Sequence, residues 1–191
     1  MSSVVDDTTT AILDATRAAV LHFGIRRTTL TDVARRAGVS RMTVYRRYPD
    51  VEALLRELMT REFSELLQAI DDDVEGPTGR ARLVNALVAG VPALREHPLF
   101  RKVLAAEPEL LIPYVFARMG GTQHAGLALI EREVAAGQQD GSIRAGDLRV
   151  LAQAVLLVEQ SFVLSAGIVE GVALRPLLAE LERLLQAALA P

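Results

Sequence analysis

Apolar residues along this chain recur at every third or fourth position, which is the period of an α-helix. No stretch alternates with period two for long enough to predict a β-strand. The first apolar stripe ends at a glycine and consists of Ile12, Leu13, Thr16, Ala19, Val20 and Phe23. Further helices are predicted over 29–38 and 40–48, followed by a long one over 50–73. Each range begins with a residue that commonly caps a helix N-terminus: Thr29, Ser40 and Asp50.

The segment 75–79 has the sequence EGPTG and is the clearest linker in the chain. Beyond it the sequence is almost continuously apolar with helical spacing. The predicted helices there cover 79–95, 98–106, 108–119, 122–137, 147–168 and 174–189. We therefore predict an all-α fold of about nine to ten helices.

Residues 29–48, TLTDVARRAGVSRMTVYRRY, have the spacing of a helix-turn-helix. Ala34, Gly38 and Val44 stand at relative positions 0, +4 and +10. There the motif needs a small residue at the helix contact, a glycine in the left-handed turn and a β-branched residue in the core. Since a helix fits the major groove of DNA, the outward side chains of the second helix are candidates to read bases.

The charge of the chain is unevenly distributed. The whole sequence has a net charge of −3, yet residues 17–47 contain eight arginines and a single acid, Asp32. A local cluster of this kind in an acidic protein is typical of a surface that binds a polyanion.

The candidate DNA contacts follow from the motif and the charge. We expect Arg41, Met42 and Tyr45 to read base edges and Arg46 and Arg47 to contact phosphates. The full candidate set is Thr29, Ser40, Arg41, Met42, Thr43, Tyr45, Arg46 and Arg47. The alternative is an αα-hairpin with a solvated basic face, but the spacing, the two caps and the arginine cluster together favour binding of double-stranded DNA.

Residues 9–55 resemble the DNA-binding domain of the TetR family of transcriptional repressors. The resemblance is carried by Ile12-Leu13-Asp14-Ala15, Phe23-Gly24, Thr28-Thr29-Leu30, Val33-Ala34, Ala37-Gly38-Val39-Ser40, Thr43-Val44-Tyr45 and Tyr48. It implies a helix-turn-helix domain over 1–50 and a helical ligand-binding and dimerisation domain over 51–191. It also implies a homodimeric repressor that a ligand releases from a palindromic operator. The family commonly has a phosphate-binding lysine where this chain has Val51, so that contact is either lost or moved to Arg46 or Arg47.

The segment 148–169 is apolar nearly all the way round, which predicts burial on two sides, and 174–188 continues the pattern. Two such helices from each of two chains form a four-helix homodimer contact. The predicted contact residues are Leu151, Val155, Val158, Phe162, Leu177, Leu181 and Leu184. The alternative is that both helices belong to the core of one chain.

Large, soft or aromatic side chains of the long helix and the middle helices are candidates to line a ligand site. They are Met59, Phe63, Phe100, Tyr114, Phe116 and Met119. The same residue types fill ordinary cores, which is the alternative. Because this region offers little charge that must face inward, we expect a small hydrophobic effector rather than a multiply charged one.

Several classes of function are disfavoured. The chain has no cysteine, and its three histidines lack partners at metal-binding spacing, so we expect no metal site and no cofactor. No nucleophile or phosphate-binding motif appears, which argues against an enzyme. A DNA-binding regulator without a ligand stays open as an alternative. We expect a cytoplasmic protein without membrane segments, since the N-terminus lacks an apolar signal and uncharged stretches are short.

Overall fold

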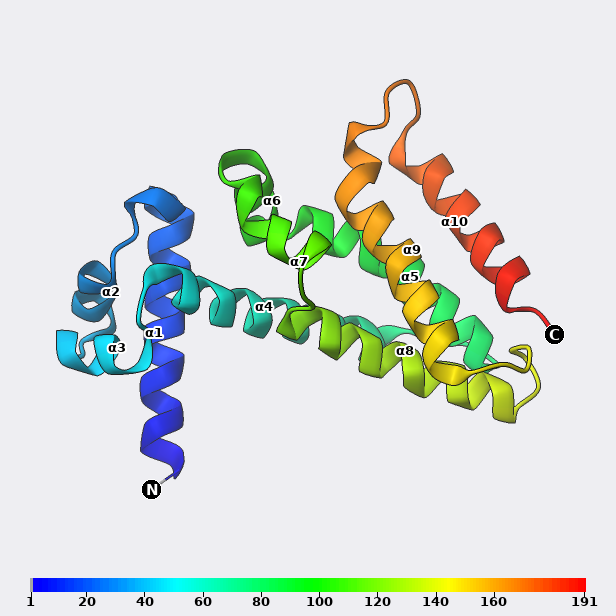
Figure 1. Ribbon diagram of the computed structural model, residues 1–191, viewed down its shortest axis with the longest axis horizontal. Helices are drawn as coiled ribbons and strands as arrows, with labels where there is room; N and C mark the ends of the chain where they lie inside the picture. The colour runs from blue at the N-terminus through cyan, green and yellow to red at the C-terminus, as the bar shows by residue number, and fades with distance from the viewer. Residues whose placement is uncertain (1) are drawn as a thin grey trace. The chain divides into compact units, whose positions relative to one another are not determined.

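The computed structural model describes residues 2–191, with side chains from residue 7 onward, and this part of the chain contains helices and no strand (Figure 1). The chain divides into two compact units. Unit 1 comprises Met1–Glu62 and His97–Gly121, and unit 2 comprises Phe63–Glu96 and Thr122–Pro191. The helix α4 (Val51–Asp73) is therefore shared between them along the chain.

Unit 1 is built on a buried stripe of its first helix. Besides the first part of α4, its elements are α1 (Ser2–Phe23), η1 (Ile25–Arg27), α2 (Leu30–Ala37), α3 (Arg41–Arg47), α6 (Pro98–Ala106), η2 (Pro108–Leu111) and α7 (Ile112–Phe116). Ile12, Val33 and Leu54 are fully buried in one core, which Leu99 of α6 also joins. Figure 1 shows α2 and α3 side by side next to α1. The amphipathic stripe thus gathers these short helices around one core.

Unit 2 consists of longer helices. Besides the end of α4 it contains α5 (Gly79–Glu96), α8 (Gly121–Gln139), α9 (Leu148–Ser165), η3 (Ala166–Ile168) and α10 (Leu174–Leu189). Helix α5 packs against both α9 and α10. At its start, a Cβ on Gly79 would lie 2.4 Å from the backbone nitrogen of Gly137, so two glycines permit α5 and α8 to touch through their backbones.

The helix predicted over 108–119 is wrong as a single element. The structure divides this segment into η2 and the short α7. Proline 113 has no N–H to donate, and its carbonyl accepts from both Ala117 and Arg118, which ends α7 after Phe116. The remaining predicted helices are found within a few residues of their expected ends, and the tail of 147–168 is the 3-10 helix η3.

One helix is longer and more apolar than the short uncharged stretches of the sequence suggested. Among the described residues, Leu148–Ile168 meets both conditions, with a mean hydropathy of 1.6 over the best window. Its interior contains Glu159, and 39% of that window is buried inside the protein. Core helices of soluble proteins satisfy the same two conditions.

Candidate nucleic-acid interface

Side-chain caps fix the starts of α2 and α3. The Thr29 hydroxyl accepts a hydrogen bond from the Asp32 N–H at 3.1 Å, and the Ser40 hydroxyl accepts one from the Thr43 N–H, also at 3.1 Å. Each hydroxyl satisfies a first-turn N–H that has no partner within its own helix. Both helices therefore begin where local sequence dictates.

The turn between these helices depends on Gly38. Its φ is 68°, in the left-handed region, where a residue with a Cβ is strained. This conformation lets the Val39 N–H donate to the Ala34 carbonyl at 3.1 Å, which closes the end of α2. Ala34 and Val44 are both buried at the contact between the two helices. The three spacings predicted for a helix-turn-helix are thus confirmed.

The outer face of α3 carries side chains that nothing in unit 1 covers. Met42 is 75% exposed and Tyr45 is 50% exposed, and Arg41 and Arg46 are exposed beside them. Thr43 is half-buried, with its hydroxyl 2.8 Å from that of Ser40. Thr29 is exposed at the start of α2. Exposed arginines beside these side chains make the face basic, as expected of a surface that contacts a polyanion.

Several arginines of the basic cluster are paired within the chain. Arg17 lies 2.7 Å from the Glu62 carboxylate, and Arg35 lies 2.9 Å from that of Asp32. Arg26 pairs with Glu109 at 3.3 Å. Because these three arginines are partly neutralised by carboxylates, the surface of residues 17–47 is less positively charged than its eight arginines suggest.

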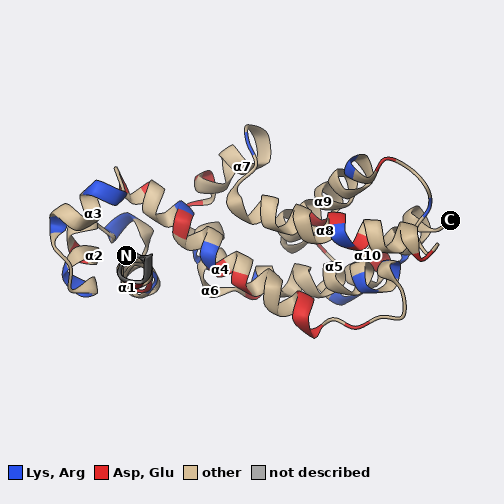
Figure 2. Ribbon diagram, turned by 90° about the horizontal axis from the view of Figure 1, so that it is seen from below, with Lys and Arg blue, Asp and Glu red and all other residues tan. Residues whose placement is uncertain are grey.

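Two further arginines contact side chains of α1. Arg36 lies over the ring of Phe23, 4.7 Å from its centroid, so the exposed end of the predicted apolar stripe makes a cation–π contact. Arg47 is half-buried and donates to the Thr9 hydroxyl. The arginines of the cluster that remain exposed on the described surface with no such contact shown are Arg27, Arg41 and Arg46. Figure 2 shows basic residues along α2 and α3.

Val51 occupies the position at which the family resemblance predicts a phosphate-binding lysine. It is the first residue of α4, is half-buried and packs against the core of unit 1. An apolar side chain held there supplies no charge to a phosphate.

A buried carboxylate joins α1 to α4. Glu62 lies within 3.0 Å of Arg61 in addition to its contact with Arg17, and Arg61 also reaches Asp14 at 2.8 Å. Burial alone raises the pKa of Glu62, but the two arginines outweigh it, so the pKa is lowered and the group stays ionised. His97, with Nε2 3.8 Å from Glu62, has a lowered pKa chiefly because it is buried. The cluster therefore ties α1 to α4 by charge.

The residues predicted to line a ligand site lie in different surroundings. Phe63 and Phe100 are buried, whereas Met59, Tyr114 and Met119 are half-buried. Phe116, the last residue of α7, is 82% exposed.

The residues predicted for a dimer contact divide into two groups. Leu151, Val155 and Leu181 are buried within the chain's own core, so they keep almost no surface for a second chain. Val158 and Leu184 are exposed. Phe162 and Leu177 are half-buried. On α9 the exposed apolar side chains also include Val150 and Leu157.

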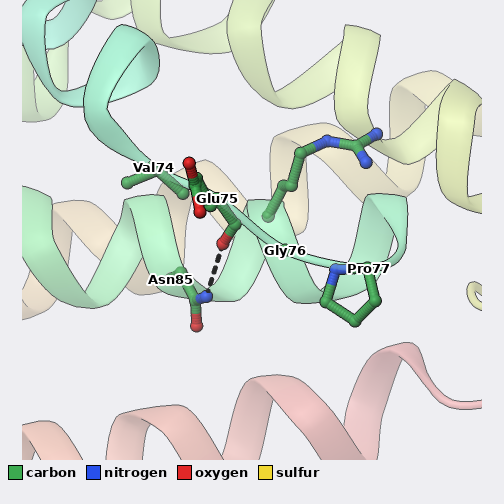
Figure 3. A pocket seen from close by; sticks show the side chains of 6 residues that line it. Val74, Glu75, Gly76, Pro77 and Asn85 are labelled. Carbon is green, nitrogen blue, oxygen red and sulfur yellow. Dashed lines mark hydrogen bonds between the residues drawn. The ribbon is translucent and has the colours of Figure 1, made fainter.

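An open hollow of about 630 Å³ lies at the linker between α4 and α5. It is lined by Val74, Glu75, Gly76, Pro77, Arg82 and Asn85, and the Asn85 amide donates to the Glu75 carbonyl at 2.9 Å (Figure 3). None of the predicted ligand residues lines it.

Sequence reasoning missed Glu159, which lies on the apolar helix α9. It is only 9% exposed, and its Oε2 atom has no hydrogen-bond partner. An acid alone in a long apolar segment is a signal of burial that was available from the sequence.

Comparison with known proteins agrees with the geometry of α2 and α3. Residues 12–58 match the model of the bacterial regulatory proteins of the tetR family. An uncharacterized HTH-type transcriptional regulator of Mycobacterium tuberculosis (strain CDC 1551 / Oshkosh) is 37% identical over 172 residues, which is 90% of this chain and 88% of that protein.

Solved structures show the same fold at low identity. The transcriptional repressor QsdR of R. erythropolis, from the TetR family, has a TM-score of 0.73 at 15% identity and covers 97% of each chain. The regulator FadR of Bacillus subtilis, solved in complex with stearoyl-CoA, has a TM-score of 0.64 at 20% identity over 94% of this chain and 98% of its own. These relatives are transcriptional regulators rather than enzymes. The chain therefore belongs to the TetR family of bacterial transcriptional regulators and binds DNA through its helix-turn-helix.

Proposed function

We propose that the protein is a homodimeric repressor that reads a palindromic operator with α3 and leaves it when a small, largely apolar ligand binds. The observation that carries this proposal is the outer face of α3, where Arg41, Met42 and Tyr45 are exposed opposite the buried Val44. Side chains near the start of a recognition helix reach base edges in the major groove.

The DNA contacts divide by chemistry. In this proposal Arg41, the first residue of α3, donates two hydrogen bonds to a guanine, and Met42 and Tyr45 supply apolar contact to neighbouring bases. Arg46 is exposed and contacts phosphate, whereas Arg47 contributes less because Thr9 already holds it. The hydroxyls of Thr29, Ser40 and Thr43 lie at the two helix starts, where phosphate contacts are common.

The homodimer uses the apolar residues that one chain leaves uncovered. Val150, Leu157 and Val158 of α9 are exposed at helical spacing, and Leu184 is exposed on α10. Such a surface favours a second copy of the same chain, because an isologous contact buries both copies of the patch at once. Phe162 and Leu177 lie at its margin.

The ligand response is proposed to start at α4 and the helices that follow it. Met59, Tyr114 and Met119 are half-buried and keep surface that a ligand can contact. The FadR structure with stearoyl-CoA shows that a protein of this fold holds a ligand with a long apolar chain. Helix α4, with 23 residues, extends about 35 Å and connects α3 to the later helices, so a tilt at one end is magnified at the other.

The test begins by selecting DNA from a random library with the purified protein. We expect two inverted half-sites about one helical turn, ~34 Å, apart. Arg41→Ala should weaken the selected site by about 1–3 kcal/mol and relax the preference at one position in each half-site. Equal loss on selected and random DNA would show that Arg41 contacts phosphate instead.

Arg46→Gln and Arg47→Gln form a matched pair. Replacing Arg46 should weaken all sequences alike and reduce the slope of log affinity against log salt by about 0.9. Replacing Arg47 should change the slope less. A slope that is unchanged for Arg46→Gln would contradict its assignment to phosphate.

A further inference from the structure

Glu159 is a buried acid in unit 2 with no partner for one of its oxygens. Its side chain is 9% exposed, and Oε2 is inaccessible and makes no hydrogen bond. The neighbouring α9 residues Val155, Leu156 and Val163 are buried apolar side chains. A carboxyl group in such surroundings destabilises the fold unless something else stabilises it.

The helix facing Glu159 is shaped around its carboxyl group. A Cβ at Gly90 of α5 would lie 2.9 Å from Glu159 Oε1, so the glycine leaves the space that this oxygen fills. Two residues later Pro92 lies inside α5, and its missing N–H removes the usual donor to the carbonyl of Val88. The contact between α5 and α9 thus contains a carboxyl group and a loosened turn of helix.

Two polar side chains of the helices that pack near Glu159 have hydrogen-bond partners other than Glu159. Arg95, the charged residue that α5 places against α9, donates to the Val163 carbonyl at 2.6 Å. Gln123 of α8 donates to Gln160 at 2.7 Å, so the amide next to Glu159 along α9 is also occupied. Neither residue neutralises Glu159. Burial raises the pKa of Glu159 to about 8, so the free protein holds it as the neutral acid at neutral pH.

We propose that Glu159 recognises a single positive charge on an otherwise apolar ligand that binds among α5, α8 and α9. This rests on the ligand response proposed above, but it places the charged end of the ligand in unit 2, whereas Met59, Tyr114 and Met119 belong to unit 1. It adds the chemical class of the ligand. The attraction between a carboxylate and an ammonium group is stronger in apolar surroundings than in water, because no water screens the two charges. The apolar residues around it bind the body of the ligand, and a neutral molecule of the same shape lacks the ion pair.

Binding of the cation is coupled to loss of a proton from Glu159. A group with a pKa of about 8 is about nine-tenths protonated at pH 7, so each bound cation should release about 0.9 proton. The cation takes the place of that proton, and the pair is neutral before and after binding.

The test compares decyltrimethylammonium, below its micelle concentration, with decanol as the neutral counterpart. Calorimetry of the full-length protein at pH 7 in two buffers of different ionisation enthalpy measures affinity and proton release together. We expect the wild type to bind the cation at least tenfold more tightly than decanol and to release close to one proton. Glu159→Gln should lose the preference and the proton release, whereas Glu170→Gln, an exposed acid in the same unit, should keep both.

Equal affinity for both probes, or binding of the cation without proton release, would overturn the role of Glu159. Proton release by the wild type is decisive even if Glu159→Gln folds poorly. The proposed repressor is tested separately by adding each probe to the protein on its selected DNA. If both probes release the DNA equally from wild type and Glu159→Gln, the repressor stands and the recognition of a cation falls. If neither probe binds the wild type, the recognition of a cation also falls, while DNA selection still decides the DNA-binding function.

Discussion

The α2–α3 pair of unit 1 and the α5–α8 contact of unit 2 are both close approaches of two helices, but different residues permit them. In unit 1 the approach depends on Ala34 and on the left-handed turn at Gly38, four residues apart in the chain. In unit 2 it depends on Gly79 and Gly137, which lie far apart in the sequence. The first contact is encoded in a single segment, and the second exists only once the helices have packed.

The two contacts also differ in how polar groups hold them. Hydroxyls of Thr29 and Ser40 cap α2 and α3 from within their own segment. The first N–H of α5 is capped by the Asp140 carboxylate at 2.7 Å, from a residue 61 positions away, and the Arg80 N–H donates to Ser142 at 3.1 Å. Unit 2 therefore depends on the turn after α8 for the start of α5.

The largest effect of a single substitution is expected where α5 and α8 touch. In Gly79→Ala the new Cβ meets backbone atoms of Gly137 at 2.4 Å, so the helices must separate. We expect a loss of about 1–3 kcal/mol in the free energy of unfolding, as for overpacked cores, visible as a lower urea midpoint by circular dichroism. Gly126→Ala is the matched control.

At Gly126 a Cβ would meet only the Leu67 and Leu156 side chains, at 3.7 and 3.9 Å, which are ordinary contacts. Alanine is also the better helix former, so this control should hold or raise the midpoint. If Gly79→Ala unfolds at the wild-type midpoint, the crossing is looser than its backbone distance indicates.

Contacts within one segment could be predicted from the sequence, and contacts between distant segments could not. The caps, the turn glycine and the buried Ala34 and Val44 were predictable because each acts within a few residues of its partner. The outward face of α3 follows from them. Nothing in the sequence pairs Gly79 with Gly137, or Asp140 with the start of α5, because these contacts depend on tertiary packing.

Electrostatics were the least predictable feature of the site. Counting charges along 17–47 overstated the basic surface, since Glu62, Glu107 and Glu109 lie beyond that segment and pair with Arg17 and Arg26. Glu159 was overlooked because a helix judged by its apolar residues hides a single acid. In both cases the missing information is which helix faces the charge.

A smaller effect tests the locally encoded contact. Gly38→Ala forces a residue with a Cβ into φ 68° and should lower the free energy of unfolding by about 1 kcal/mol. Part of the backbone strain is offset because alanine lowers the conformational entropy of the unfolded chain. Gly38→Asn should cost less, because asparagine tolerates the left-handed region. Thermal unfolding and binding to the selected DNA should fall in parallel. Equal stability of the alanine and asparagine variants would mean that the turn can adopt another conformation.

The smallest effect concerns pH and the cap supplied by Asp140. Hydrogen bonds from the Gly79 N–H, and then from Ser142, lower the pKa of Asp140 below its usual 3.8. A lowered pKa in the folded state stabilises the protein above the unfolded value and loses that contribution as the pH falls through the folded value. Urea midpoints of wild type and Asp140→Asn should therefore differ by a constant amount above about pH 5 and converge below about pH 4.

Asp147→Asn serves as the comparison, because Asp147 caps α9 from within its own segment through the Val150 N–H at 3.0 Å. A gap for Asp140→Asn that stays the same down to pH 3 would show that the long-range cap acts through shape rather than through its charge.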